Sequence, residues 1–267
     1  MKLPLNTDLT GKTVVITGAG GVLGGMFAKA LAQAGGKVAL LDLNQEAAKK
    51  AAKEISEEGY IAKGYAANVL QKESLAAAHE QIKKDFGLCD ILINGAGGNN
   101  PKATTDQEYY VPGELKEGEK SFFDLEQSGV EFVFNLNFIG TLLPTQEFAQ
   151  DMLEKEGCNI INISSMKAAV SNFTEWLAVH FSKSRIRVNG IAPGFFATKQ
   201  NRELLFEKDG TPTPRTGKIL AATPLGRFGE SEELIGTLLF LLNNEASGFI
   251  TGVVIPVDGG FQAYSGV

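Results

Sequence analysis

The sequence is poor in cysteine, histidine and proline. Its 267 residues include two cysteines, two histidines and nine prolines. Cys89 and Cys158 stand apart in apolar runs without the paired spacing of a zinc site, so we expect neither a metal site nor a disulfide framework. Each thiol is more simply interpreted as a small buried side chain.

Basic charge and long apolar runs are also scarce. The 25 lysines and arginines are outnumbered by 31 aspartates and glutamates, giving a net charge of −6, so no basic surface is expected for nucleic acid. No stretch reaches the ~20 apolar residues of a membrane span, and the opening MKLPLNTDLTGK has no apolar core of a signal peptide. We therefore expect a cytoplasmic protein that binds neither nucleic acid nor a membrane.

Short β-branched runs alternate with helical patterns from Thr13 onward. This alternation predicts an α/β protein, with a doubly wound parallel sheet flanked by helices on both faces. No linker divides the chain, so residues 1–267 should form a single domain. The expected first helix covers 24–34, and the expected strands cover 14–17, 38–42, 61–67, 90–94, 159–164, 186–191 and 253–257.

Residues 98–127 differ from the rest of the chain. The run is polar, punctuated by proline and glycine, and long for a connection. It follows the end of a predicted strand, where open α/β sheets bind ligands. It is therefore either a substrate loop or a surface insertion.

A glycine-rich turn joins the first strand to the first helix. Glycines at that point let the backbone approach a pyrophosphate, and the free N–H groups of the helix stabilise its charge. Asp42 ends the second strand, where a carboxylate can accept hydrogen bonds from ribose hydroxyls and repel the extra phosphate of NADP. Asp42 could alternatively cap a helix, although Asn44 is better placed to do so. The pattern favours NAD, with the turn residues Thr17, Gly18, Gly20, Gly21, Val22, Leu23 and Gly24 as its predicted ligands.

Seven motifs in order along the chain give it a family resemblance. They are TGAGGVLG, INGAG, NLNFIG, NIINISS, KAAVSNF, RVNGIAPGFFAT and ITGVVIPVDGG. The chain resembles the short-chain dehydrogenase/reductase family, which implies a Rossmann fold, a homotetramer and hydride transfer between a nicotinamide and a hydroxyl or carbonyl. By position, the resemblance implies that Asn94, Ala96 and Gly97 line the adenosine side and that Pro193, Gly194 and Thr198 hold the nicotinamide end. Two departures are mild: Val22 replaces a motif glycine, and Asn68, followed by Val69, replaces an aspartate that commonly contacts adenine.

The catalytic set implied by the resemblance is incomplete. Ser165 matches the serine that bonds the reacting oxygen, and Asn137 the asparagine of the proton relay. Lys167 matches the lysine that lowers the pKa of a tyrosine and binds the ribose of the cofactor. That tyrosine is absent: the family places it about thirteen residues after the serine and four before the lysine. Either about fifteen residues ending just before Lys167 are missing from the sequence, or a genuine deletion has left a non-catalytic NAD-binding protein. The intact mass distinguishes the two accounts.

The substrate is suggested by a narrower resemblance. The run GAGGNNPKATT, the long insertion and the tail VIPVDGGFQAYSGV resemble the D-mannonate oxidoreductases, which implies NADH-dependent reduction of D-fructuronate to D-mannonate. Asn99, Asn100 and Arg202 are candidates for binding such a sugar acid, although Arg202 could instead pair with a nearby glutamate. Another polyol, gluconate or keto-sugar reductase is the alternative. We interpret Arg227 as structural and Trp176 as part of the core or a subunit contact.

Overall fold

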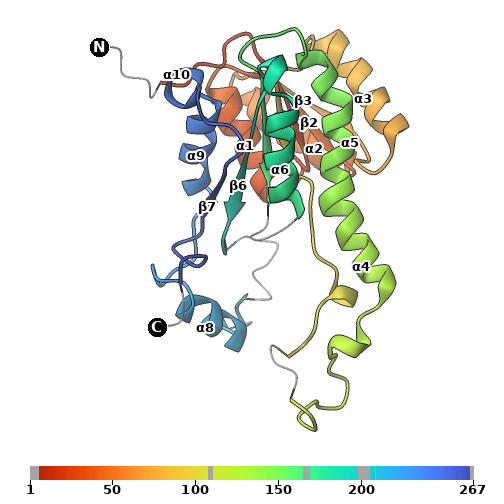
Figure 1. Cartoon of the computed structure of the whole chain (residues 1–267), viewed down its shortest axis with the longest axis vertical. Coiled ribbons are helices and arrows are strands. Elements are labelled where there is room, and N and C mark those ends of the chain that lie inside the picture. The colour runs from red at the N-terminus through yellow and green to blue at the C-terminus, as the bar shows by residue number, and fades with distance from the viewer. Residues whose placement is uncertain (1–5, 108–110, 165–168, 198–204, 208, 265–267) are drawn as a thin grey trace.

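Seven parallel strands form one sheet at the centre of the molecule (Figure 1). The computed structural model describes residues 6–107, 111–164, 169–197, 205–207 and 209–264. The strands are β1 (Thr13–Thr17), β2 (Lys37–Asp42), β3 (Ala62–Ala66), β4 (Ile91–Asn94), β5 (Asn159–Ile163), β6 (Arg187–Pro193) and β7 (Val254–Val257). Their order, β3-β2-β1-β4-β5-β6-β7, reverses direction after β3, as in a doubly wound sheet. The predicted fold class and all seven strands are confirmed.

Helices fill the connections between the strands. They are α1 (Val22–Gln33), α2 (Gln45–Glu57), α3 (Lys72–Asp85), α4 (Gln127–Phe134), α5 (Gly140–Phe148), α6 (Ala169–His180), α8 (Pro214–Ala221), α9 (Glu233–Leu242) and α10 (Asn244–Ser247). A π-helical turn, Asn135–Ile139, joins α4 to α5. Short 3₁₀ turns cover Pro101–Ala103, Phe122–Asp124, Ala149–Met152 and Ser182–Ser184.

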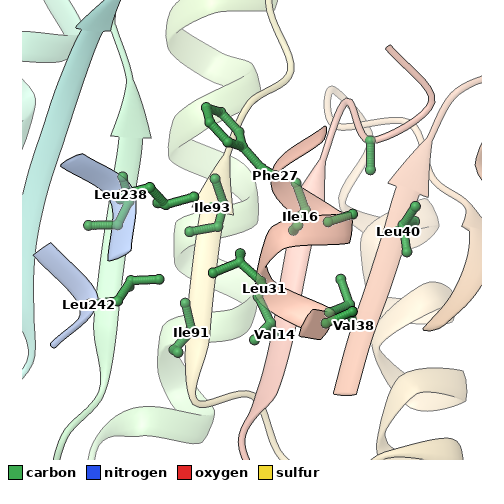
Figure 2. Close-up of a cluster of buried hydrophobic side chains, with 14 of the residues drawn as sticks. Val14, Ile16, Phe27, Leu31, Val38, Leu40, Ile91, Ile93, Leu238 and Leu242 are labelled. Carbon is green, nitrogen blue, oxygen red and sulfur yellow. The ribbon is translucent and has the colours of Figure 1, made fainter. Parts of the chain in front are cut away.

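Two apolar layers cover the sheet because successive strand side chains point to opposite faces. Val14 and Ile16 of β1 join one layer with Phe27 and Leu31 of α1. Val15, between them, joins the other layer, which includes residues of α3, α5 and α6. Figure 2 shows the first layer, where Leu238 and Leu242 of α9 lie beside Ile91 and Ile93 of β4.

The edge strands do not follow the expected pattern of burial on both faces. In β3 only Tyr65 is buried, and no residue of β7 is fully buried. Each edge strand has a neighbour on one side only, so helices cover it less completely than the central strands. The expectation of near-complete burial holds for β1, β2, β4, β5 and β6, but it is wrong for the two edges.

Residues 98–127 are here called the arm, and their described parts, 98–107 and 111–127, extend away from the sheet alongside α4 (Figure 1). Asp106 and Lys120 close the arm on itself: the backbone N–H of Asp106 donates to Lys120 O at 3.0 Å, and the N–H of Lys120 donates to the Asp106 carboxylate at 2.7 Å. At the base of the arm, Lys102 Nζ lies 2.7 Å from Glu126 Oε2. The described parts of the arm therefore have local structure held by hydrogen bonds, and the role of the arm as a substrate loop stays a prediction.

The two cysteines are buried and unpaired with each other. Cys89 and Cys158 are both inaccessible to solvent, and burial raises the pKa of each thiol, so both are protonated at neutral pH. In the part of the chain that the structure describes, no helix is long and apolar enough to cross a membrane. Within those same residues, no cluster of three or more metal-ligating side chains occurs.

Trp176 and Arg227 were both interpreted as structural, but only Arg227 has surroundings that fully agree with that interpretation. Trp176 is 56% exposed and stacks on His180 at 4.8 Å, so its assignment to the core is wrong and a subunit contact stays a prediction. Arg227 forms two 2.7 Å hydrogen bonds to the Glu233 carboxylate, consistent with a structural role. Those bonds hold the pKa of Glu233 at about 2.

A buried histidine joins α3 to α5. His79 Nδ1 lies 2.8 Å from Glu147 Oε1, and its Nε2 lies 2.8 Å from Asp151 Oδ2. Asp151 also accepts the backbone N–H of Cys89. We predict that His79→Ala lowers the free energy of unfolding by about 3 kcal/mol, because it leaves a buried carboxylate without its partner. Urea denaturation measures the change.

His180 provides the matched control. It is the only other histidine, and its side chain is exposed. His180→Ala should change the free energy of unfolding by less than about 0.5 kcal/mol. Equal effects of the two substitutions would contradict the role given to His79.

Candidate functional site

The turn between β1 and α1 brings the backbone very close to β4. Gly18 has a φ of +69°, and a Cβ built on it would lie 2.8 Å from Ala96 Cα. A Cβ on Gly24 would lie 2.4 Å from Gly18 O. Only glycine fits at both places, and α1 starts directly after Gly21 with no side chain capping its first N–H groups. Those N–H groups are available to an anion such as a pyrophosphate.

This packing makes Gly24→Ala strongly disruptive. The added methyl must displace the backbone of the turn, so we expect a loss of about 1–3 kcal/mol in the free energy of unfolding, together with weaker dinucleotide binding. Thermal denaturation and cofactor titration measure the two effects.

Gly25→Ala is the matched control on the same helix. A Cβ there meets Ala19 O at 3.5 Å, which is an ordinary contact. Because alanine favours helix over glycine, this change should leave binding intact and add about 0.5–1 kcal/mol of stability. Loss of binding in both variants would contradict the close-approach argument.

Asp42 lies at the carboxyl end of β2, against the glycine turn. Its Oδ2 accepts the backbone N–H of Gly20 at 2.9 Å, and its Oδ1 accepts the N–H of Asn44 at 2.9 Å. These two bonds fix the orientation of the carboxylate, and each oxygen keeps a lone pair for another donor. Asn44 caps α2 by accepting the N–H of Ala47 at 3.1 Å, so the alternative role of Asp42 as that cap is wrong.

A cavity of about 440 Å³ opens between the glycine turn, β2 and β4. Eight predicted cofactor residues line it: Gly18, Gly20, Gly21, Val22, Leu23, Gly24, Asp42 and Gly97. Three residues that were not predicted to bind the cofactor line it too: Asn44, which the sequence indicated only as a helix cap, Ala47 and Gly95. Asn44 and Ala47 belong to the start of α2, and a strand followed directly by a helix cap was the signal available for them.

Other predicted cofactor residues lie off the cavity wall. Thr17 is buried, and its hydroxyl accepts the N–H groups of Gly95 and Ala96 at 3.1 and 3.2 Å. Asn94 is 1% exposed and points into the protein toward Thr145. The remaining described ones not on this wall are Asn68, Val69, Ala96, Pro193 and Gly194.

Asn137 lies in the π-helical turn and reaches the loop after β4. Its Nδ2 donates to Gly98 O at 2.8 Å, and its Oδ1 accepts the N–H of Gly98 at 3.1 Å. The structure therefore brings Asn137 next to the cavity-lining Gly97. Its role in a proton relay stays a prediction.

Four predicted site residues lie outside the described residues: Ser165, Lys167, Thr198 and Arg202. The ends of the elements that flank two of them are defined, because β5 ends at Ile163 and α6 begins at Ala169. Five residues, 164–168, separate these two elements in the sequence.

The two candidate amides of the arm already have local partners. Asn99 Nδ2 donates to Thr104 Oγ1 at 3.3 Å, and Asn99 Oδ1 accepts the N–H of Asn100. Asn100 Oδ1 accepts the N–H of Lys102 at 2.9 Å, which caps the first 3₁₀ turn. These bonds hold both amides at the base of the arm, and substrate contact stays a prediction.

Tyr65 cannot replace the missing tyrosine. It lies on the edge strand β3, where its hydroxyl donates to Asp85 Oδ2 at 2.8 Å. Burial and that hydrogen bond raise its pKa far above the usual range, so it holds its proton at neutral pH. Tyr60 lies before β3 and Tyr264 after β7, while Tyr109 and Tyr110 fall outside the described residues.

Comparison with known proteins gives the same family throughout. A family model described as enoyl-(acyl carrier protein) reductase, of the adh_short_C2 type, matches residues 18–262. An uncharacterised oxidoreductase of Haemophilus influenzae is 58% identical, covering 100% of this chain and 99% of its own length. The Bacillus subtilis oxidoreductase UxuB, also uncharacterised, is 49% identical over 99% of this chain and 100% of its own. A 5-keto-D-gluconate 5-reductase of Escherichia coli is 30% identical, covering 95% and 96% of the two chains.

A solved structure is similar over the whole chain. It is that of a candidate D-mannonate oxidoreductase from Haemophilus influenzae with bound NAD, at a TM-score of 0.95, 58% identity and full coverage of both chains. The sequence alignment with the Haemophilus influenzae relative spans 282 positions, 15 more than the 267 residues of this chain. That relative therefore has about fifteen residues without a counterpart here, which matches the size of the segment expected before Lys167.

Proposed function

Because the chain belongs to the short-chain dehydrogenase/reductase family, whose members are oxidoreductases acting on CH–OH groups, we propose that it interconverts D-fructuronate and D-mannonate with NAD. The preference for NAD is supported by Asp42, whose carboxylate is held in place on the wall of the glycine-lined cavity. A carboxylate there accepts bonds from ribose hydroxyls and repels a 2′-phosphate. The bound NAD of the Haemophilus influenzae structure supports the same choice.

The residues of the cavity fit a dinucleotide. Gly18 and Gly24 leave a cradle that a Cβ would fill, and the first N–H groups of α1, which no side chain caps, would bind the pyrophosphate. When bound, NAD supplies the hydride donor or acceptor of the reaction. The chain holds the dinucleotide through the glycine turn and Asp42 and, by family position, through Pro193, Gly194 and Thr198.

The family pattern assigns part of the proton chemistry to this chain's own side chains and the proton donor to a tyrosine that the sequence lacks. Ser165 would donate a hydrogen bond to the reacting oxygen, and Lys167 would favour the ionised form of the tyrosine electrostatically. Asn137 would hold the relay water beside Gly98. Reduction adds a hydride to the keto carbon and a proton to its oxygen, and the tyrosine of the family pattern gives that proton.

The sugar-acid substrate draws support from two relatives. One is the candidate D-mannonate oxidoreductase, and the other is the 5-keto-D-gluconate 5-reductase, which acts on a keto acid of similar size. The test follows NADH oxidation with D-fructuronate, 5-keto-D-gluconate and neutral ketoses. A preference for D-fructuronate supports the proposal, and equal or better turnover of the other ketones overturns it.

Arg202 is the proposed partner of the substrate carboxylate. A guanidinium matches a carboxylate with two parallel hydrogen bonds, which a neutral ketose cannot form. Arg202→Ala should therefore raise the KM for the acid more than the KM for a neutral ketose. Equal effects on both would remove this role from Arg202.

The missing tyrosine favours a second candidate function. If the deletion is genuine, the chain is an NAD-binding protein without a proton donor, and it binds NAD without turnover on any of these ketones. If the purified protein has the 28.5 kDa mass of the 267-residue sequence, that result supports this candidate. A mass greater by about fifteen residues supports the enzyme.

We also propose a homotetramer, as the family resemblance implies. A groove of about 460 Å³ between α5 and α6 has an apolar lining that includes Leu142, Phe173 and Trp176. Apolar helix faces of this kind are buried when a second subunit packs on them. Sedimentation velocity should give four times the chain mass, and a monomer would exclude the proposal.

A further inference from the structure

A chain of buried hydrogen bonds runs from Asn137 to the first turn of α6. It begins in the π-helical turn, where the Thr141 hydroxyl donates to Asn137 O at 3.0 Å. One turn further along α5, the Thr145 hydroxyl donates to Thr141 O at 2.8 Å. Both threonines are almost completely buried. Each tightens its own helix by bonding the carbonyl four residues earlier.

This chain of hydrogen bonds then passes from α5 to α6 through side chains of two strands, β4 and β5. Asn94 of β4 donates through Nδ2 to Thr145 Oγ1 and to Asn162 Oδ1, both at 2.9 Å. Asn162 of β5 donates through Nδ2 to Thr174 Oγ1 at 2.9 Å. The Thr174 hydroxyl donates to Val170 O at 2.7 Å, in the first turn of α6. Asn162 and Thr174 have no exposed surface.

Only one arrangement of protons makes all of these hydrogen bonds, and it leaves the buried Asn94 Oδ1 without a partner. The Thr145 hydroxyl gives its single proton to Thr141 O, so it can only accept from Asn94. Both hydrogens of Asn94 Nδ2 are then used, which orients the amide of Asn162 and makes Thr174 an acceptor as well. Because these side chains are buried away from water, breaking one of these hydrogen bonds leaves a buried polar atom without a partner rather than a solvated one.

One end of this series of hydrogen bonds is a predicted site residue, and the other is close in sequence to another. One end is Asn137, which also holds Gly98 through its side chain. The other end is Val170, three residues after Lys167 in the sequence. We infer that Thr141, Thr145, Asn162 and Thr174 are positioning residues that fix the turn of Asn137 relative to the start of α6. The catalytic significance rests on the proposed function, whereas the mechanical coupling does not.

Hydrogen exchange of the 267-residue chain tests the coupling without any need for turnover. Thr174→Val replaces the hydroxyl with a methyl group on α6, while Thr174→Ser keeps the hydroxyl. We expect Thr174→Val to speed amide exchange in the distant turn 135–141 about five- to tenfold, and Thr174→Ser to leave it near wild type. Thr145→Val tests the chain from the other side and should speed exchange in the first turn of α6.

Thr13→Val is the matched control for lost stability. Thr13 is also buried and also donates to a backbone carbonyl, Phe86 O at 2.9 Å, but at the opposite end of the sheet. It should not affect the turn 135–141. Exchange that rises only within α6, or rises equally in Thr13→Val, overturns the inference. The double variant Thr145→Val/Thr174→Val should show less than the sum of the two effects, and strict additivity also overturns it.

Turnover separates this inference from the proposed function. In an active enzyme, Thr174→Val should lower kcat and leave the KM for NADH unchanged, with recovery in Thr174→Ser. An unchanged kcat in Thr174→Val, together with wild-type exchange in the turn 135–141, overturns the positioning role. A wild-type protein without any turnover overturns the proposed function alone, because the exchange result stands independently.

Discussion

Restoring the missing segment is expected to raise turnover by about 10²–10⁴-fold, the usual contribution of a positioned general acid. The change inserts, between Met166 and Lys167, about fifteen residues with a tyrosine four positions before Lys167, where the family pattern places it. The Haemophilus influenzae relative aligns with the 267-residue chain over 282 positions, which sets the length of the insertion. The measurement is the initial rate of NADH oxidation with D-fructuronate as substrate.

The physical reason is the proton that a reduced ketone must receive. Tyrosine and lysine each have a pKa of ~10, so neither exchanges protons efficiently at neutral pH when isolated. A lysine one helical turn away favours tyrosinate and brings the tyrosine pKa toward the working range. In the 267-residue chain, no such tyrosine precedes Lys167. Tyr65 lies on the edge strand β3, and its hydroxyl is hydrogen-bonded to Asp85.

The control is the same insertion with its tyrosine replaced by phenylalanine. NAD affinity should be equal in all three proteins, because the cavity is formed by the glycine turn and Asp42 rather than by the insertion. Equal turnover of the tyrosine and phenylalanine insertions would show that the tyrosine is not the proton donor. A 267-residue chain as active as the restored one would show that another group gives the proton.

The fold was predictable because each central strand carries its own signal. Val14, Val15 and Ile16 are apolar in succession, and the structure places them alternately in the two layers. The exceptions are the edge strands, where the sequence looks similar but the number of neighbouring strands differs. That number depends on strand order, which a single sequence does not state locally.

The candidate site was predictable where the residues that act together are close in the sequence. Gly18 and Gly24 act through a turn of seven residues, so their spacing was visible, and Asp42 follows from the end of the next strand. Asn94 was assigned to the adenosine side, yet its side chain points toward Thr145, 51 positions further along. The partners Thr145, Asn162 and Thr174 come from different elements, and only the folded sheet brings them together.

Cofactor preference should shift about 100-fold when the charge of Asp42 is removed. Asp42→Asn keeps the size of the side chain and loses its negative charge. NADH should bind about tenfold more weakly, because a charge-assisted bond to ribose becomes a neutral one. NADPH should bind about tenfold more tightly, because its 2′-phosphate no longer faces a carboxylate. Fluorescence titration of both dinucleotides measures the shift and needs no turnover.

Asp8→Asn removes the same charge at a distance from the cavity. Asp8 is another carboxylate that accepts a backbone N–H, from Thr10 at 2.9 Å, and its side chain is not among those that line the cavity. Its substitution should change neither dissociation constant, so an effect seen in both variants would reflect net charge alone.

If Asp42→Asn leaves the ratio of the NADH and NADPH dissociation constants unchanged, the NAD preference is set by other residues. Because Gly20 donates to Asp42, thermal denaturation of Asp42→Asn separates a displaced turn from a lost ribose contact: a folded variant with weaker NADH binding identifies the contact.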